Sequence, residues 1–260
     1  MKLLAITMLL AGAALAQDAS LKARELFYTP PPDAAPKKPA AKTQAQSPKT
    51  TQAPMTHHSQ PMIPAVNAAN VPLGLRYSVL KRDASGKFAE VDADSTFRSG
   101  DRIRLHVDTN TSGYLYVVMQ GSSGNWRLLF PSSEVEGGNN RIEKGSSQQI
   151  PAGDKGQFVF DQQSGTEKLF LVLSRKPEAD LDKLIYSITG AQSSDRTLVA
   201  QASVADDVVN RLRDEVKSRD LVFEKVNEDG AAPEKATYVV NPNRTDDARL
   251  VVDVALKHGK

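Results

Sequence analysis

Polar and apolar residues alternate strictly along residues 102–107, which places three aliphatic side chains on one face of an extended chain. Residues 114–119 and 169–173 are almost continuously apolar, a pattern typical of strands that are covered on both faces. Seven shorter segments are further candidate strands: 75–80, 125–130, 148–150, 157–160, 220–226, 236–240 and 249–256. Short strands separated by glycine-rich turns predict a mainly β chain folded as an antiparallel β-sandwich.

One segment in the C-terminal third has the periodicity of an amphipathic helix. Ser203 stands where it can cap the N-terminus of this helix, and a shorter helical turn is expected over 179–186. The pattern leaves open whether residues 197–257 complete the sandwich or form a small appendage, and we favour one continuous domain. The apolar residues that recur at every fourth position of the helix are Val208, Leu212 and Val216.

The segment 113–131 contains the only tryptophan and predicts a β-hairpin that turns at a Gly-Ser-Ser-Gly sequence. Trp126 is followed at period two by Leu128 and Phe130. A large aromatic residue with apolar neighbours at this spacing is more typical of a core than of a ligand platform. Pro131 is expected to end the strand, because proline has no N–H to donate to the sheet.

The first residues predict export of the chain. A basic start is followed by an apolar run over residues 3–15 and by a small-x-small sequence that ends at Ala16. Residues 1–16 are therefore interpreted as a signal peptide that is cleaved between Ala16 and Gln17. No other stretch reaches the roughly 18 apolar residues that a membrane-spanning helix needs, so we expect no transmembrane segment in the mature chain. The expected location is periplasmic or extracellular.

Composition divides the rest of the chain. Residues 17–28 can form a short N-terminal helix. Residues 29–70 contain nine prolines and no aromatic residue, which predicts a disordered, proline-rich linker. Residues 71–260 are expected to fold as one β-rich domain. That domain holds 26 basic and 28 acidic residues, so the excess of basic residues lies in the leader and linker, and no specific nucleic-acid binding is predicted.

Groups that carry catalysis are scarce. The chain has no cysteine, which excludes thiol catalysis, disulfide bonds and a lipid-anchored N-terminal cysteine. His57 and His58 lie in the linker, His258 lies near the C-terminus, and His106 is expected on a polar strand face with its arginine neighbours. The sequence predicts neither a metal site nor a cofactor, and the chain is not expected to be an enzyme. Two carboxylates placed for glycan hydrolysis remain a distant alternative.

A long polar loop, residues 132–147, is the leading candidate for a contact surface. Loops of this length in sandwiches often carry binding, although a solvated loop is the simpler interpretation. The side chains suited to a sugar, a peptide or a cation are Glu134, Glu136, Asn139, Asn140 and Arg141.

Several short motifs follow one another in a particular order along residues 75–181. This order resembles the bacterial family known as domain of unknown function 4384. The resemblance implies a β-rich accessory module without catalytic residues, and it leaves the activity open. The motifs are Gly100-Asp101-Arg102-Ile103, Gly113-Tyr114-Leu115-Tyr116, Leu129-Phe130-Pro131, Ile150-Pro151 and Gly165-Thr166-Glu167.

These features together predict a secreted or periplasmic, non-catalytic binding module that recognises a protein or a cell-envelope polymer. An alternative is a structural component of an envelope assembly, which docks through its N-terminal segment or through an open sheet edge. An envelope glycan hydrolase is the third and most distant possibility.

Overall fold

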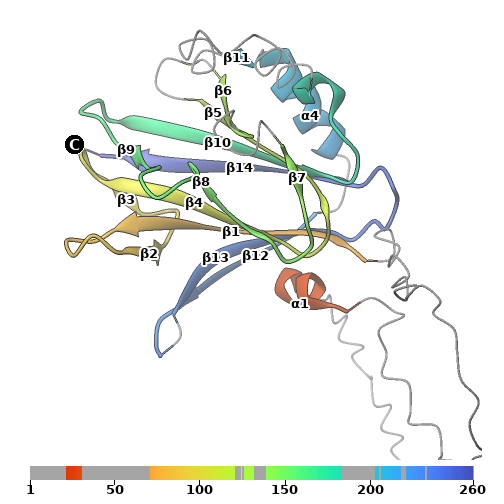
Figure 1. Cartoon of the computed structure of the whole chain (residues 1–260), viewed down its shortest axis with the longest axis horizontal. Coiled ribbons are helices and arrows are strands. Elements are labelled where there is room, and N and C mark those ends of the chain that lie inside the picture. Colours follow the sequence, from red (N-terminus) through yellow and green to blue (C-terminus); the bar gives the residue numbers. More distant parts are fainter. Residues whose placement is uncertain are drawn as a thin grey trace, which may run out of the picture.

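The computed structural model describes residues 22–30, 71–120, 124, 126–131, 139–182, 203–204, 206–217, 221–231 and 233–259. These residues form two stacked β-sheets with a helix on each outer face (Figure 1). The chain is mainly β, as the period-two pattern predicts.

The first sheet, sheet A, has the strand order β12-β13-β1-β4-β8, with β2 paired to β1 and β9 paired to β4. All of its pairings are antiparallel. Its strands are β1 (Leu73–Arg82), β2 (Phe88–Val91), β4 (Arg102–Thr109), β8 (Ser147–Ile150), β9 (Phe158–Val159), β12 (Val222–Glu228) and β13 (Glu234–Asn241).

The second sheet, sheet B, has the order β11-β6-β5-β10-β14-β3, with β7 paired to β5. Its pairings are antiparallel except for the parallel contact of β14 with β3. Its strands are β3 (Thr96–Phe97), β5 (Gly113–Gln120), β6 (Trp126–Phe130), β7 (Arg141–Ile142), β10 (Gly165–Ser174), β11 (Ser203–Val204) and β14 (Arg249–His258).

The main core lies between the two sheets. Alternate residues of β1 and β4 face alternate residues of β5, β10 and β14, and their side chains are almost completely buried. The alternation along 102–107 is borne out, because Ile103, Leu105 and Val107 all lie in this core. A two-sheet sandwich of this kind buries one face of each strand and leaves the other face for helices or solvent.

The C-terminal strands complete the sandwich rather than forming an appendage. β12 and β13 extend sheet A beside β1, and β14 lies between β10 and β3 in sheet B. The β10–β14 pairing is continuous from Gly165 opposite His258 to Ser174 opposite Arg249. Both sheets therefore depend on residues from the last quarter of the chain.

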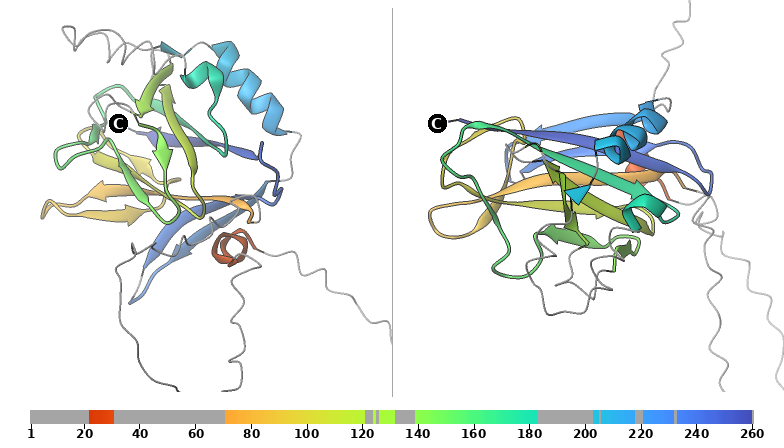
Figure 2. Two further views of the ribbon diagram at one scale, coloured as in Figure 1. Left: turned by 45° about the vertical axis from the view of Figure 1, so that its right-hand side comes forward. Right: turned by 90° about the horizontal axis from the view of Figure 1, so that it is seen from above.

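Helix α4 (Asp206–Lys217) covers the outer face of sheet B (Figure 2), where Val209 and Leu212 pack on buried side chains of β5, β6 and β10. The proposed cap of this helix is wrong. Ser203 lies in β11 opposite Arg127 of β6, and the helix begins only at Asp206. The turn expected over 179–186 is helical in its described part, 179–182.

A β-bulge in β6 corrects the predicted register of the hairpin. Val118 pairs with Leu128 but Val117 pairs with Phe130, which leaves Leu129 as an extra residue. Trp126 and Leu128 consequently point to the outer cluster under α4, whereas Phe130 lies in the core between the sheets. The three residues do not share one face. Strand β6 ends before Pro131, as expected.

Candidate functional site

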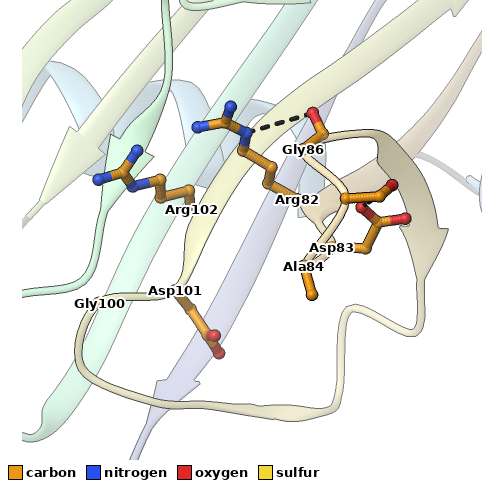
Figure 3. A pocket seen from close by; sticks show the side chains of 8 residues that line it. Arg82, Asp83, Ala84, Gly86, Gly100, Asp101 and Arg102 are labelled. Atoms are coloured by element: carbon orange, nitrogen blue, oxygen red, sulfur yellow. Dashed lines mark hydrogen bonds between the residues drawn. The ribbon is translucent and has the colours of Figure 1, made fainter.

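Two turns at one end of the sandwich enclose an open hollow of about 470 Å³ (Figure 3). One turn joins β1 to β2 and the other leads from β3 into β4. Arg82 and Asp83 come from the first turn, and Asp101 and Arg102 come from the second. These four side chains supply the charged groups of the hollow.

Both aspartates are used to build the turns. The Asp83 carboxylate accepts hydrogen bonds from Ser85 Oγ (2.7 Å) and from the Lys87 N–H (3.0 Å), and the Ser85 bond is the largest contribution to the lowered pKa of Asp83. The Asp101 carboxylate accepts from the Arg98 N–H (2.9 Å) and from Lys81 Nζ (2.6 Å). Burial opposes the charge on Asp101, but these two partners lower its pKa.

Unlike the two aspartates, Arg82 and Arg102 make few hydrogen bonds within the described residues. Lys81 pairs with Ile103 across β1 and β4, so Arg82 and Arg102 follow on adjacent strands on the outer face of sheet A. Arg82 Nε donates to the Gly86 carbonyl at 3.2 Å. Within the described residues, no carboxylate pairs with either guanidinium group, and both side chains are exposed. Figure 3 shows the two guanidinium groups near each other, with Asp101 directed away from them.

Carboxylates gather at the opposite end of this face. Arg76 contacts Glu90 at 2.7 Å, Asp108 at 3.0 Å and Glu234 at 3.0 Å, and its side chain is only 11% exposed. Burial opposes the charge of Asp108, but hydrogen bonds from neighbouring side chains and the charge of Arg76 lower its pKa to about 2. The charges are therefore segregated along the outer face of sheet A, with the acidic groups paired around Arg76 and two guanidinium groups at the hollow.

Comparison with known proteins gives one match. The model of a family described as a domain of unknown function, DUF4384, matches residues 96–177. The match covers 82 of the 260 residues of the chain. No curated protein and no solved structure matches it. The DUF4384 match agrees with the family resemblance of the sequence motifs, and it runs from β3 to β10.

The DUF4384 segment contributes Arg102 and Asp101 to the hollow, whereas Arg82 and Asp83 lie outside the match. The sequence patterns did not point to Arg82, and they included Arg102 only as part of the motif Gly100-Asp101-Arg102-Ile103 and as a neighbour of His106. The available signal was that an arginine lies next to each of two turns, Asp83-Ala84-Ser85-Gly86 and Arg98-Ser99-Gly100-Asp101.

His106 lies on the outer face of sheet A, as predicted, with its Nε2 3.3 Å from the Asp108 carboxylate. The neighbouring Arg104 is almost buried, because it donates to the backbone carbonyls of Asp154 and Gly156 and stacks 4.4 Å from the centre of the Phe88 ring. In the part of the chain that the structure describes, no three His, Asp or Glu side chains are grouped as they would be around a metal ion. Nor is any described helix long and apolar enough to span a membrane.

Of the five loop residues proposed as a contact surface, three are described. Asn139 Oδ1 accepts from the Arg141 N–H at 3.0 Å, the Asn140 carbonyl accepts from the Leu115 N–H at 3.0 Å, and Arg141 pairs with Glu143 at 3.1 Å. These contacts fasten the end of the loop to β5. Four other predicted residues lie outside the described part of the chain, namely Glu134 and Glu136 of the loop and Ala16 and Gln17 of the predicted cleavage site.

Trp126 is a core residue of the DUF4384 segment. Its side chain is 3% exposed, its ring meets Phe170 edge-on at 6.0 Å, and the Arg213 guanidinium lies 5.3 Å from the ring centre. Because α4 covers this face of sheet B, the ring is not available as a platform for a ligand.

Proposed function

We propose that this protein is an exported, non-catalytic binding module that recognises an anionic group on an envelope polymer or protein through Arg82 and Arg102. The observation that carries the proposal is the pair of exposed guanidinium groups on adjacent strands, which no carboxylate of the described residues neutralises. A guanidinium group presents its N–H donors as a planar fork that matches carboxylate and phosphate oxygens.

The chemistry of the hollow favours recognition over turnover. Arginine stays protonated at any physiological pH, so it orients and neutralises an anion but does not act as a base. Asp83 and Asp101 have lowered pKa values and already accept hydrogen bonds within their turns. Turns at the end of a rigid sandwich are also a common place for binding sites.

The test is binding of the purified full-length chain to an insoluble envelope-polymer preparation. Arg102→Ala is expected to weaken binding by roughly ten- to a hundredfold, since a hydrogen bond to a charged group contributes about 1.5–3 kcal/mol. Arg127→Ala is the matched control, because Arg127 is also an exposed strand arginine, and it should leave binding unchanged. Binding should weaken as salt is raised. Neither variant should change the melting temperature appreciably.

The predicted loop is the competing contact surface. Replacing Glu134, Glu136, Asn139, Asn140 and Arg141 together should have little effect if the hollow is the site. If the loop variant loses binding while Arg102→Ala still binds normally, the contact surface is residues 132–147 and not the hollow. If the purified chain hydrolyses envelope glycan, the protein is an enzyme and the proposal of a non-catalytic binding module is wrong.

A second candidate function, docking through a sheet edge, is supported by β12. It is the last strand of sheet A, and the side chain of Phe223 is 56% exposed. An exposed edge strand can add a strand from a partner through main-chain hydrogen bonds. Under this alternative, Phe223→Glu should abolish partner capture while Arg102→Ala leaves it intact.

A further inference from the structure

Helix α1 (Ala23–Tyr28) packs against apolar side chains on the outer face of β12 and β13 (Figure 1). Ala23 and Phe27 are buried there against side chains of both strands, and the Phe27 ring meets Tyr238 edge-on at 5.3 Å. Gly74 of β1 leaves room for the ring, since a Cβ at that position would lie 2.9 Å from Phe27 Cδ2. We call this surface of β12, β13 and Gly74 the socket.

The rim of the socket is acidic and is matched by one arginine of the helix. The Arg24 N–H donates to Glu224 at 2.9 Å, and its guanidinium group pairs with Glu228 at 3.1 Å and with Glu234 at 2.9 Å. The Tyr28 hydroxyl lies 3.2 Å from that of Tyr238. Apolar and charged contacts thus select one orientation of the segment.

The segment depends on the socket for its structure. A helix of six residues is far below the length at which an isolated helix is stable in water, so docking and helix formation must occur together. The contacts that fix α1 come from its own residues and from sheet A, and none requires the chain that follows Pro30.

The segment that connects α1 to β1 is much longer than their positions in the fold require. Phe27 packs next to Gly74, yet forty residues, 31–70, separate the described N-terminal segment from the start of the domain. Forty residues can reach on the order of 130 Å when extended. A tether of this length gives its own helix an effective concentration of at most roughly 1 mM at the socket, which a second copy can approach.

We propose that the socket is a docking site for residues 22–30 of a second copy of this chain, so that two copies exchange their N-terminal helices. The second copy would contribute Arg24 and Phe27 to the same acidic and apolar surface. Since the exchanged and unexchanged forms make identical contacts, concentration and tether length decide between them. This proposal does not depend on the arginine hollow.

The absence of cysteine allows a direct test on the full-length chain. A donor dye is attached to Lys22→Cys in one preparation, and an acceptor dye is attached to Ala231→Cys, at the exposed β12–β13 turn, in another. Energy transfer between the mixed preparations is expected to rise with concentration, reaching half of its maximum near roughly 1 mM. A singly labelled mixture reports only contacts between copies.

Two variants make the result specific. Phe27→Ala removes the buried ring and should abolish the transfer. Glu25→Gln, on the exposed side of the same helix, keeps a side-chain oxygen that can accept from the Lys22 N–H and should preserve the transfer. The proposal is overturned if no transfer develops up to roughly 1 mM, or if Phe27→Ala leaves the transfer unchanged. A chain that carries both dyes is also measured. If it shows strong energy transfer within one molecule, while no transfer occurs between singly labelled copies, the helix binds only its own domain and the proposal is overturned.

Discussion

Replacement of Arg76 by methionine tests the charge distribution on sheet A. The substitution keeps a long apolar stem but removes the cation that contacts Glu90, Asp108 and Glu234 at 2.7–3.0 Å. Those carboxylates are 15–22% exposed, so water can replace only part of the lost interaction. Removing one partner of a buried ion pair typically costs about 3–5 kcal/mol.

Neighbouring groups place the expected loss near the lower end of that range. Arg24 still contacts Glu234 at 2.9 Å, and His106 and Ser147 still hydrogen-bond to Asp108. Glu90 keeps the Lys235 N–H at 2.9 Å but loses its only cation among the described residues. We expect a decrease of about 3 kcal/mol in the free energy of unfolding at pH 7.

The loss should depend on pH with a defined sign. In the native chain the pKa of Asp108 is lowered to about 2 and that of Glu90 is also lowered, so both groups stabilise the fold above the unfolded pKa values near 4. This contribution disappears as pH falls toward 2. Without Arg76, burial favours the protonated carboxyls. Mild acid should therefore reduce the difference in the free energy of unfolding between the variant and the native chain.

Urea unfolding at pH 7 and pH 4 measures both quantities. Arg82→Met is the matched control, because it lies on the same strand and the same face but has no carboxylate partner in the described residues, and it should change stability by less than about 0.5 kcal/mol. A loss below about 1 kcal/mol for Arg76→Met, or a loss that is the same at both pH values, would refute the assigned role of Arg76.

Two further predictions concern packing. Trp126→Ala should lower the free energy of unfolding by about 3–5 kcal/mol, and native Trp126 should have blue-shifted fluorescence that soluble quenchers reach poorly; exposed, readily quenched emission would contradict the buried position. Gly113→Ala should cost roughly 1–3 kcal/mol because its Cβ would lie 2.7 Å from the Ser174 carbonyl oxygen, and Gly165→Ala, whose Cβ would meet nothing within 4 Å, should be nearly neutral in the same denaturation assay.

Local periodicity was sufficient to predict most of the strands and the C-terminal helix. The aliphatic residues of 102–107 are buried as their period-two spacing predicts. On the helix Leu212 is buried as predicted, but its buried companion is Val209, and the predicted Val208 is only partly buried. The very short strands β3, β7 and β11 have no periodicity of their own, and they exist because a longer neighbour offers main-chain partners. The bulge at Leu129 was invisible for a similar reason, since register is a property of two strands.

The candidate site was harder to predict than the fold. Arg82 and Arg102 are twenty positions apart in the sequence, and only the pairing of Lys81 with Ile103 brings them to one surface. The composition did not indicate an anion-binding site, because the domain has almost no net charge and the proposed site depends on where the charges lie. What distinguishes these two arginines is that every nearby carboxylate in the described structure is engaged elsewhere, and that is a spatial property.

The DUF4384 match and the sandwich do not have the same boundaries, and this difference bears on function. The matched residues end at 177, yet β4 has β1 as its neighbour and β10 has β14 as its neighbour, and both partners lie outside the match. The matched segment would therefore leave long strand edges open if nothing flanked it. Here β1 and β14 close those edges, and β1 also delivers Arg82 to the hollow. The arginine pair is consequently a property of how this chain completes its DUF4384 segment, and a chain that completes the segment differently need not share the proposed anion specificity.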